Sequence, residues 1–314
     1  MKAVIFGNTC RSEVAACTHK LLAALARHDV EMLMERDFLI FLRGMGVPID
    51  LFISEKNLID YRDYEADLAF VVGGDGTFIH SAAKVGRRDL PMIGINAGRL
   101  GFLTDLADSH IDEVVDSLMS GKYTCMERTL LRLHTDEKVY TDFNYALNEV
   151  TVSKMDSASL ITIHTWVNGK FLNSYQADGL IVSTATGSTA YSMSVGGPIL
   201  MPNVPAFIII PVAPHSLTMR PLIIPDTSTV ELKVESRSNH FLIALDGRSN
   251  VFDEHISMRI NKSAFTIKTI KLEDHNFFDT MREKLMWGSD KRKYLKKGYD
   301  DDDKEEGCAD ATAK

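Results

Sequence analysis

The chain has 314 residues, 45% of them hydrophobic, so it can bury one large core or two modest ones. Its formal net charge is −8, but residues 300–314 contribute −5, and the near-neutral remainder argues against a general electrostatic grip on nucleic acid or on a membrane. The four cysteines are scattered without a Cys-x-x-Cys pair, and the longest apolar run, residues 21–26, is too short to span a bilayer, so we expect a cytoplasmic protein.

The first third of the chain alternates predicted strands and helices. A helix is predicted at residues 13–26 from its apolar spacing, and a further helix and short strand are placed within residues 36–65. Strands are predicted at residues 3–6, 30–34, 68–72 and 92–95. This pattern predicts an α/β domain with a parallel sheet over residues 1–121.

The most informative segment follows the predicted strand at residues 68–72, whose five apolar residues indicate burial on both faces. Gly73 and Gly74 interrupt this strand, Asp75 follows, and Gly76 precedes a helix predicted at residues 77–85. Open α/β sheets bind ligands at the carboxyl ends of their strands, and glycines let bare N–H groups approach a phosphate. A lone carboxylate in such a loop suits phosphoryl transfer to a hydroxyl; a tight turn capped by the aspartate is the alternative.

The second half of the chain is rich in short β-branched or alternating segments. Asn168-Gly169 predicts a hairpin turn between two of them. Strands are predicted at residues 130–134, 145–153, 160–167, 171–174, 180–183, 207–210, 229–234, 241–245 and 265–270. Residues 122–271 are therefore expected to form a β-rich domain.

The carboxyl-terminal part of the sequence divides in two. Residues 272–287 contain a predicted amphipathic helix at 277–285, which we expect to pack back on the first domain. Residues 288–314 consist of a basic block followed by an acidic one without apolar periodicity, which predicts a disordered charged tail.

Three further segments carry polar groups within or beside predicted strands. Asn148-Glu149 is a polar pair inside an apolar strand, which is costly unless the pair is satisfied or used, and a structural role is equally open. Residues 178–192 lead from a strand through small hydroxyl residues into a helix predicted at 189–195; ligand binding and simple turn chemistry both fit them. Asp246-Gly247-Arg248 by itself predicts an ordinary turn.

Taken in order, these segments resemble the NAD kinases, particularly the bacterial ones, over residues 1–287. The first motif alone is shared with phosphofructokinases and lipid kinases, whereas the whole ordered set is specific. The resemblance rests on Gly73-Gly74-Asp75-Gly76-Thr77, Gly94-Ile95-Asn96, Gly101-Phe102-Leu103, Asn148-Glu149, Asp178-Gly179-Leu180, the segments 183–192 and 196–199, Pro214-His215-Ser216-Leu217 and Arg220-Pro221-Leu222.

The resemblance implies an N-terminal α/β domain, a β-rich C-terminal domain and an active site between them. The implied reaction transfers the γ-phosphoryl group of ATP to the 2′-hydroxyl of the adenosine ribose of NAD, which gives NADP. Asp75 would accept the hydroxyl proton, and Gly74 and Gly76 would flank the phosphates. The other implied dinucleotide-binding residues are Asn148, Glu149, Asp178, Thr186, Thr189, Ala190, Tyr191, Ser192, Ser194 and Arg248. Asp178 would contact the dinucleotide either of its own chain or of a neighbouring subunit.

The resemblance also bears on cofactors and partners. Mg²⁺ would arrive with ATP, and no dedicated metal site is predicted. We expect a homo-oligomer, a dimer or a tetramer, without nucleic acid or membrane partners. The sequence departs from many relatives at Ala185, where they have Pro, and from some bacterial ones at Gln176 and Ser159, where they carry Arg and His.

Two other functions are consistent with the glycine-aspartate loop. A lipid or sugar kinase would share it, but the hydroxyl-rich segment 183–192 argues against that class. A non-catalytic dinucleotide-binding regulator is opposed by Asp75, because a phosphate cradle gains nothing from a negative charge beside phosphates. The choice between ATP and polyphosphate as donor, and between NAD and NADH as acceptor, stays open.

Overall fold

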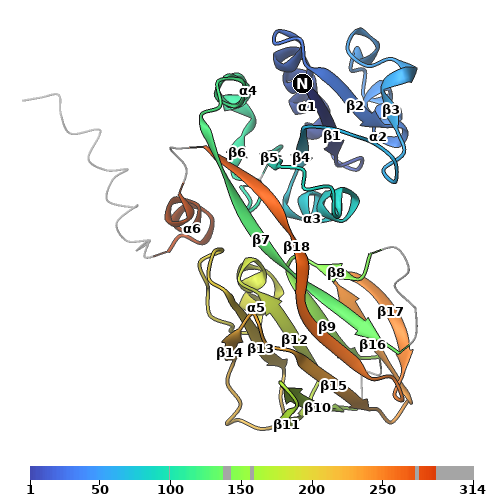
Figure 1. Ribbon diagram of the computed structural model, residues 1–314, viewed down its shortest axis with the longest axis vertical. Helices are drawn as coiled ribbons and strands as arrows, with labels where there is room; N and C mark the ends of the chain where they lie inside the picture. Colours follow the sequence, from blue (N-terminus) through green and yellow to red (C-terminus); the bar gives the residue numbers. More distant parts are fainter. Residues whose placement is uncertain (99, 137–142, 156–158, 273–275, 288–314) are drawn as a thin grey trace, which may run out of the picture. The chain divides into compact units, whose positions relative to one another are not determined.

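The computed structural model describes residues 1–98, 100–136, 143–155, 159–272 and 276–287, and the chain divides into two compact units at residues 275 and 276 (Figure 1). The described part of the second unit, residues 276–287, contains helix α6 (Phe277–Leu285), which confirms the predicted helix. Asn276 begins it, accepting hydrogen bonds from the N–H groups of Phe278 and Asp279. Its packing on the first domain stays a prediction, and the predicted tail at residues 288–314 lies outside the described residues.

The first unit begins with a parallel sheet flanked by helices. Its strands lie in the order β5-β4-β1-β2-β3, and each neighbouring pair is parallel, as the βαβ pattern predicts. The elements are β1 (Lys2–Gly7), α1 (Glu13–Ala26), β2 (Glu31–Glu35), α2 (Arg36–Gly44), β3 (Leu58–Ile59), β4 (Leu68–Gly73), α3 (Asp75–Val85), β5 (Met92–Asn96), β6 (Leu106–Ala107) and α4 (Ile111–Met119), with 3₁₀ turns at Ile49–Leu51, Glu55–Asn57 and Asp108–His110. Helix α3 begins at Asp75, two residues before the predicted start, because Gly74 rather than Gly76 precedes its first turn.

Hydrophobic side chains pack on both faces of this sheet. Phe70 of β4 packs on one face with residues of α1, α2 and α4, such as Leu21. On the other face, Phe78 of α3 belongs to a cluster that also includes Leu103 and Leu147. This second cluster matters for the site, because it draws together segments that lie more than forty residues apart in the sequence.

The β-rich part of the unit contains a six-stranded antiparallel sheet in the order β14-β13-β12-β9-β16-β17. On its inner face, Val182 of β12 packs in one hydrophobic cluster with Ile163 of β10. Strand β10 belongs to the other sheet, which also contains the parallel strands. The elements are β7 (Tyr123–Thr135), β8 (Tyr145–Ala146), β9 (Glu149–Lys154), β10 (Ile161–Val167), β11 (Lys170–Ala177), β12 (Gly179–Thr184), a 3₁₀ turn at Thr186–Thr189, α5 (Tyr191–Ser194), β13 (Ala206–Val212), β14 (Leu222–Pro225), β15 (Val230–Glu235), β16 (His240–Leu245), β17 (Arg248–Asp253) and β18 (Met258–Leu272). The hairpin turn predicted at Asn168-Gly169 is confirmed, with φ angles of 52° and 72°.

Strand β18 joins the parallel sheet to the β-rich part. It pairs with β7 along almost its whole length, with β15 near its start, and with β5 at Thr269 and Met92 (Figure 1). One sheet therefore runs from the parallel strands through β18 into β15, β10 and β11. The sequence predicts only residues 130–134 near the end of β7 and residues 265–270 in the second half of β18. The first residues of β7 are exposed and carry no burial signal.

Two local predictions are wrong. The single strand predicted at residues 145–153 is interrupted at Leu147 and Asn148, which form a bend between β8 and β9. The helix predicted at 189–195 is only the four-residue α5, preceded by a 3₁₀ turn. Within the described ranges, none of the helices combines the length and the apolarity that crossing a membrane requires.

Candidate active site

Asp75 lies at the junction of β4 and α3, at the carboxyl end of the parallel sheet. Its carboxylate accepts hydrogen bonds from the backbone N–H groups of Phe102 (2.9 Å), Leu103 (2.9 Å) and Thr104 (3.2 Å), and from the Thr104 hydroxyl (3.2 Å). Three consecutive amides thus converge on one carboxylate. Asp75 therefore holds the 102–104 segment in place, in addition to any chemical role.

Two glycines make this arrangement sterically feasible. A Cβ at Gly101 would lie 2.0 Å from Asp75 Oδ1, and a Cβ at Gly94 would lie 2.5 Å from the carbonyl oxygen of Leu103. At Gly74 and Gly76, in contrast, a Cβ would meet nothing within 4 Å. The first pair of glycines admits the 102–104 segment, whereas the second pair leaves open space in which a ligand can approach the backbone.

Asp246, which follows β16, binds a second segment in the same way. Its carboxylate accepts hydrogen bonds from the N–H groups of Leu147 (2.7 Å), Asn148 (2.8 Å) and Glu149 (3.1 Å). Burial raises the pKa of Asp246, and these backbone hydrogen bonds oppose the rise. The bend that interrupts the predicted strand thus exists because its amides turn toward this carboxylate.

The hydroxyl-rich segment holds the same bend from the carbonyl side. The Thr184 hydroxyl donates to the carbonyl oxygen of Leu147 (2.6 Å), while the Thr184 N–H (2.8 Å) and the Ser183 hydroxyl (3.2 Å) donate to that of Asn148. A Cβ at Gly187 would lie 2.2 Å from the Asn148 carbonyl oxygen. Turn chemistry therefore accounts for Ser183 and Thr184, whose hydroxyls satisfy backbone groups.

Three side-chain atoms at the bend and at α5 are buried without a hydrogen-bond partner among the described residues: Asn148 Oδ1, Glu149 Oε2 and Ser192 Oγ. A buried unsatisfied polar group costs about 1–3 kcal/mol, so such groups are rare in folded proteins unless a ligand satisfies them. Burial, and then the nearby Asp246, raise the pKa of Glu149 to about 8, although a backbone hydrogen bond with Tyr191 opposes the rise. Near neutral pH, a protonated Glu149 can therefore donate a hydrogen bond as well as accept one.

The remaining predicted residues of the segment lie close to this cluster in the chain. Thr186 is buried, and its carbonyl oxygen accepts a hydrogen bond from the hydroxyl of Thr189 (3.3 Å). Ala190 is half-buried and Ser194 is exposed. Tyr191 is 43% exposed, so its side chain is accessible to a ligand and does not belong to the core.

Asp178 lies away from this cluster along its strand, whereas Arg248 lies close to Asp246 and interacts with it electrostatically. Asp178 directly precedes β12, and its carboxylate forms an ion pair with Lys154 at 2.6 Å. It lies five residues before Ser183, which corresponds to about 16 Å along an extended strand. Arg248 donates hydrogen bonds to the carbonyl oxygens of Phe143 (2.8 Å) and Tyr145 (2.5 Å). The structure therefore places the Arg248 guanidinium on protein carbonyl groups.

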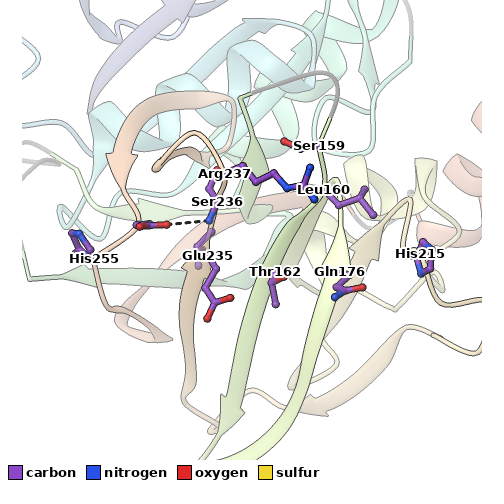
Figure 2. A pocket seen from close by; sticks show the side chains of 11 residues that line it. Ser159, Leu160, Thr162, Gln176, His215, Glu235, Ser236, Arg237 and His255 are labelled. Carbon is purple, nitrogen blue, oxygen red and sulfur yellow. Dashed lines mark hydrogen bonds between the residues drawn. The ribbon is translucent and has the colours of Figure 1, made fainter.

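An open cavity of about 880 Å³ lies apart from these residues, beside β10, β11 and β15 (Figure 2). Gln176 and Ser159, the two positions at which the sequence departs from some bacterial NAD kinases, both line it. Its wall carries both signs of charge, including Arg237 and Glu235. Among the described residues, no group of three His, Cys, Asp or Glu side chains is arranged to hold a metal ion.

The models of the ATP-NAD kinase N-terminal and C-terminal domains match residues 5–123 and 147–272. The NAD kinase of Bacteroides fragilis is 44% identical over 292 residues, which cover 93% of this chain and 100% of the relative. The NAD kinase of Cytophaga hutchinsonii is 42% identical over 273 residues, covering 87% and 93% of the two chains. The chain belongs to the NAD kinase family. It is therefore a phosphotransferase, as the ordered motifs predicted.

Solved structures of NAD kinases share the fold of this chain. The Archaeoglobus fulgidus NAD kinase in complex with ATP has a TM-score of 0.69 at 25% identity, covering 91% of this chain and 99% of that one. Yeast NADH kinase complexed with NADH has a TM-score of 0.80 at 24% identity, covering 92% and 89%, a likeness that bears on the fold alone. The predicted combination of an α/β part and a β-rich part is confirmed.

Sequence reasoning missed the role of Asp246 in this NAD kinase, because Asp246-Gly247-Arg248 alone predicts an ordinary turn. A signal was present in the repetition of a dipeptide. Asp-Gly lies just beyond the end of a strand at both Asp75 and Asp246, and in both places the carboxylate binds three consecutive amides. Gly94 and Gly101, noted only as part of the resemblance, prove to be the residues that admit the 102–104 segment.

The raised pKa of Glu149 predicts a pH dependence of stability. Its pKa rises from 4.5 to about 8 on folding, so the folded state keeps a proton that the unfolded state releases. This contribution to stability is complete below pH 4.5 and is lost as the pH rises through 8. The free energy of unfolding should therefore fall by about 2–4 kcal/mol from this residue between pH 5 and pH 8, at 1.36 kcal/mol per pKa unit.

Denaturant unfolding of Glu149→Gln across this pH range measures the effect. The variant should lose the fall assigned to Glu149, whereas Glu13→Gln, at an exposed glutamate of α1, should retain the wild-type profile. Identical profiles for wild type and Glu149→Gln would contradict the raised pKa.

Proposed function

We propose that this NAD kinase transfers the γ-phosphoryl group of ATP to the 2′-hydroxyl of the adenosine ribose of NAD, giving NADP. The observation that carries the proposal is the set of buried, unpartnered oxygens of Asn148, Glu149 and Ser192. Each belongs to a segment implied to bind the dinucleotide, and the backbone of Asn148 and Glu149 is held on both sides. A polar ligand that supplied hydrogen bonds to these oxygens would recover the free energy that their burial costs.

Asp75 is proposed as the group that accepts the proton of the ribose hydroxyl. A carboxylate within hydrogen-bond reach can take this proton as the new P–O bond forms. The positions of Leu103 and Leu147 support one site for both substrates, because each residue lies in a segment bound by an aspartate and both belong to a single hydrophobic cluster. The open space beside Gly74 and Gly76 suits phosphate groups.

Mg²⁺ would enter with ATP. Magnesium in phosphoryl-transfer enzymes commonly keeps several waters and binds through substrate phosphates and one or two carboxylates. That mode needs no metal site built from protein side chains alone.

The reaction is tested by incubating the purified protein with NAD, ATP and Mg²⁺ and measuring NADP. Inorganic polyphosphate as donor and NADH as acceptor, assayed in parallel, establish the range of both substrates. Formation of NADP supports the proposal. Phosphorylation of a lipid or sugar without NADP formation would favour the alternative kinase class.

Asp75→Asn should nearly abolish turnover. Asn preserves the size of the side chain but cannot accept the proton, so kcat should fall by ~10²–10⁴ while KM for NAD changes only a few-fold. The variant also replaces one oxygen with an NH₂ group that faces N–H donors, so a structural control is needed. Thr104→Val removes the hydroxyl that donates to Asp75 but keeps the carboxylate.

Steady-state kinetics of the two variants distinguish chemistry from structure. If Asp75 is the base, Thr104→Val should lose far less activity than Asp75→Asn. Equal losses would show that Asp75 acts by holding the 102–104 segment alone.

Tyr191 is proposed to stack on the base of the bound dinucleotide. Tyr191→Ala should raise KM for NAD by ~5–100-fold, corresponding to about 1–3 kcal/mol of stacking, while KM for ATP moves much less. Because the ring is 43% exposed, the melting temperature should change little. Tyr123→Ala, at another exposed tyrosine, serves as the control. An unchanged KM for NAD with a collapsed melting temperature would defeat the proposal.

Asp178 is proposed to reach the dinucleotide of a neighbouring subunit in a homo-oligomer. This placement would explain why Asp178 lies about 16 Å along β12 from the bend that carries Asn148. Asp178→Ala and Asp75→Asn should each be weakly active alone. After mixing and subunit exchange, about a quarter of the sites of a dimer would combine both intact residues. Failure to recover activity, with subunit exchange demonstrated, would place the Asp178 contact within its own chain or remove it.

A cytoplasmic location is also proposed. The three cysteines among the described residues are all free thiols, which suits a reducing compartment. Recovery of the protein in an extracellular fraction would contradict this placement.

A further inference from the structure

A cluster of charged side chains lies next to the segment that Asp75 binds. Asp105 directly follows this segment, and its carboxylate forms an ion pair with the Nζ of Lys271 on β18. The two side chains are only 8% and 17% exposed. Arg128 on β7 is 3% exposed, and its Nε donates a hydrogen bond to Thr269 Oγ1 at 3.2 Å.

The register of β7 and β18 explains why both cations face the same way. Arg128 lies opposite Ile267, and Lys271 lies four residues further along β18. Strand residues two or four apart share a face, so Arg128, Thr269 and Lys271 lie on one face of the ribbon. Both cations interact electrostatically with Asp105 and also with Asp75.

The cluster balances two buried cations with two carboxylates. Burial lowers the pKa of Arg128 to about 10 and also lowers that of Lys271, while both carboxylates oppose this shift. Buried ion pairs rarely stabilise a fold more than well-packed apolar side chains do. Stability alone therefore gives little reason for four charged groups at this position.

The position of Asp105 in the chain suggests what the cluster does. Its neighbour Thr104 donates both its N–H and its hydroxyl to Asp75. The 102–105 segment is thus held by Asp75 on one side and by Lys271 on the other. Because Arg128 and Lys271 belong to the ribbon that joins the two parts of the fold, the segment is fixed relative to that ribbon.

We propose that Asp105, Arg128 and Lys271 form a positioning network that fixes the 102–104 segment and, through it, the carboxylate of Asp75 for phosphoryl transfer. The network acts through Asp75, so the proposal rests on the function proposed above. Misplacement of a reacting group by 1 Å can lower the rate about 100-fold. A restraint on Asp75 can therefore offset the desolvation cost of burying these charged groups.

Three variants of the full-length protein test the network kinetically. Asp105→Asn leaves one cation unbalanced, and kcat should fall by ~10–100-fold with KM for NAD and ATP within about threefold. Asp105→Asn combined with Lys271→Met restores the charge balance between Arg128 and Asp75 but not the tether. Its melting temperature should stay within ~3 °C of wild type, while kcat stays low. Asp89→Asn, which removes a surface ion pair with Lys268 on the same strand, is the control and should keep wild-type kcat.

Hydrogen exchange of the Leu103 and Thr104 amides provides a readout that does not depend on activity. Both amides donate to Asp75, so they should exchange about tenfold faster in the double variant, with the β4 amides unchanged. Wild-type kcat and wild-type exchange in the double variant would overturn the network. If the wild-type protein made no NADP, the proposed function would fail, whereas the exchange result would still decide whether the network holds the segment.

Discussion

A carboxylate that accepts the N–H groups of three consecutive residues is the interaction on which the site depends. It occurs twice, at Asp75 with residues 102–104 and at Asp246 with residues 147–149. Backbone N–H groups in a bend have no strand partner, and leaving them buried and unpaired would cost about 1–3 kcal/mol each. One carboxylate satisfies three of them at once and gives the bend a single shape.

The surrounding fold is arranged to permit these two interactions. Gly94 and Gly101 remove the Cβ atoms that would collide with the first bound segment, and Gly187 does so for the second. Leu103 is the central residue of the first bound segment, and Leu147 is the first residue of the second. Both bury their side chains in one hydrophobic cluster with Phe78. Hydrophobic packing therefore brings the segments 102–104 and 147–149 close together in space, although they are far apart in the sequence.

The sequence predicts the elements whose signal is local. Helix α1, strand β4 and the turn at Asn168-Gly169 follow from apolar spacing, a continuous apolar run and a dipeptide that tolerates positive φ. The bend at Leu147 and Asn148 could not be predicted, because its cause is the carboxylate of Asp246, about a hundred residues away. The pairing of Asp105 with Lys271 depends likewise on the register of β18 with β7, which no local pattern specifies.

The candidate site shows the same division between local and distant causes. The sequence identifies Asn148 and Glu149 as a polar pair in an apolar context. Their hydrogen bonds and the pKa of Glu149 depend on distant groups such as Asp246, which only the fold brings close. Ser183 and Thr184, which by type could have been ligand contacts, satisfy the backbone of the bend. Asn148 Oδ1 and Glu149 Oε2 have no hydrogen-bond partner among the described residues, and the restrained main chain beneath them cannot move to provide one. The backbone is thus ordered before any ligand arrives, so ligand binding carries no entropic cost of ordering it. A ligand that hydrogen-bonds to the unpartnered oxygens would add the free energy of those bonds.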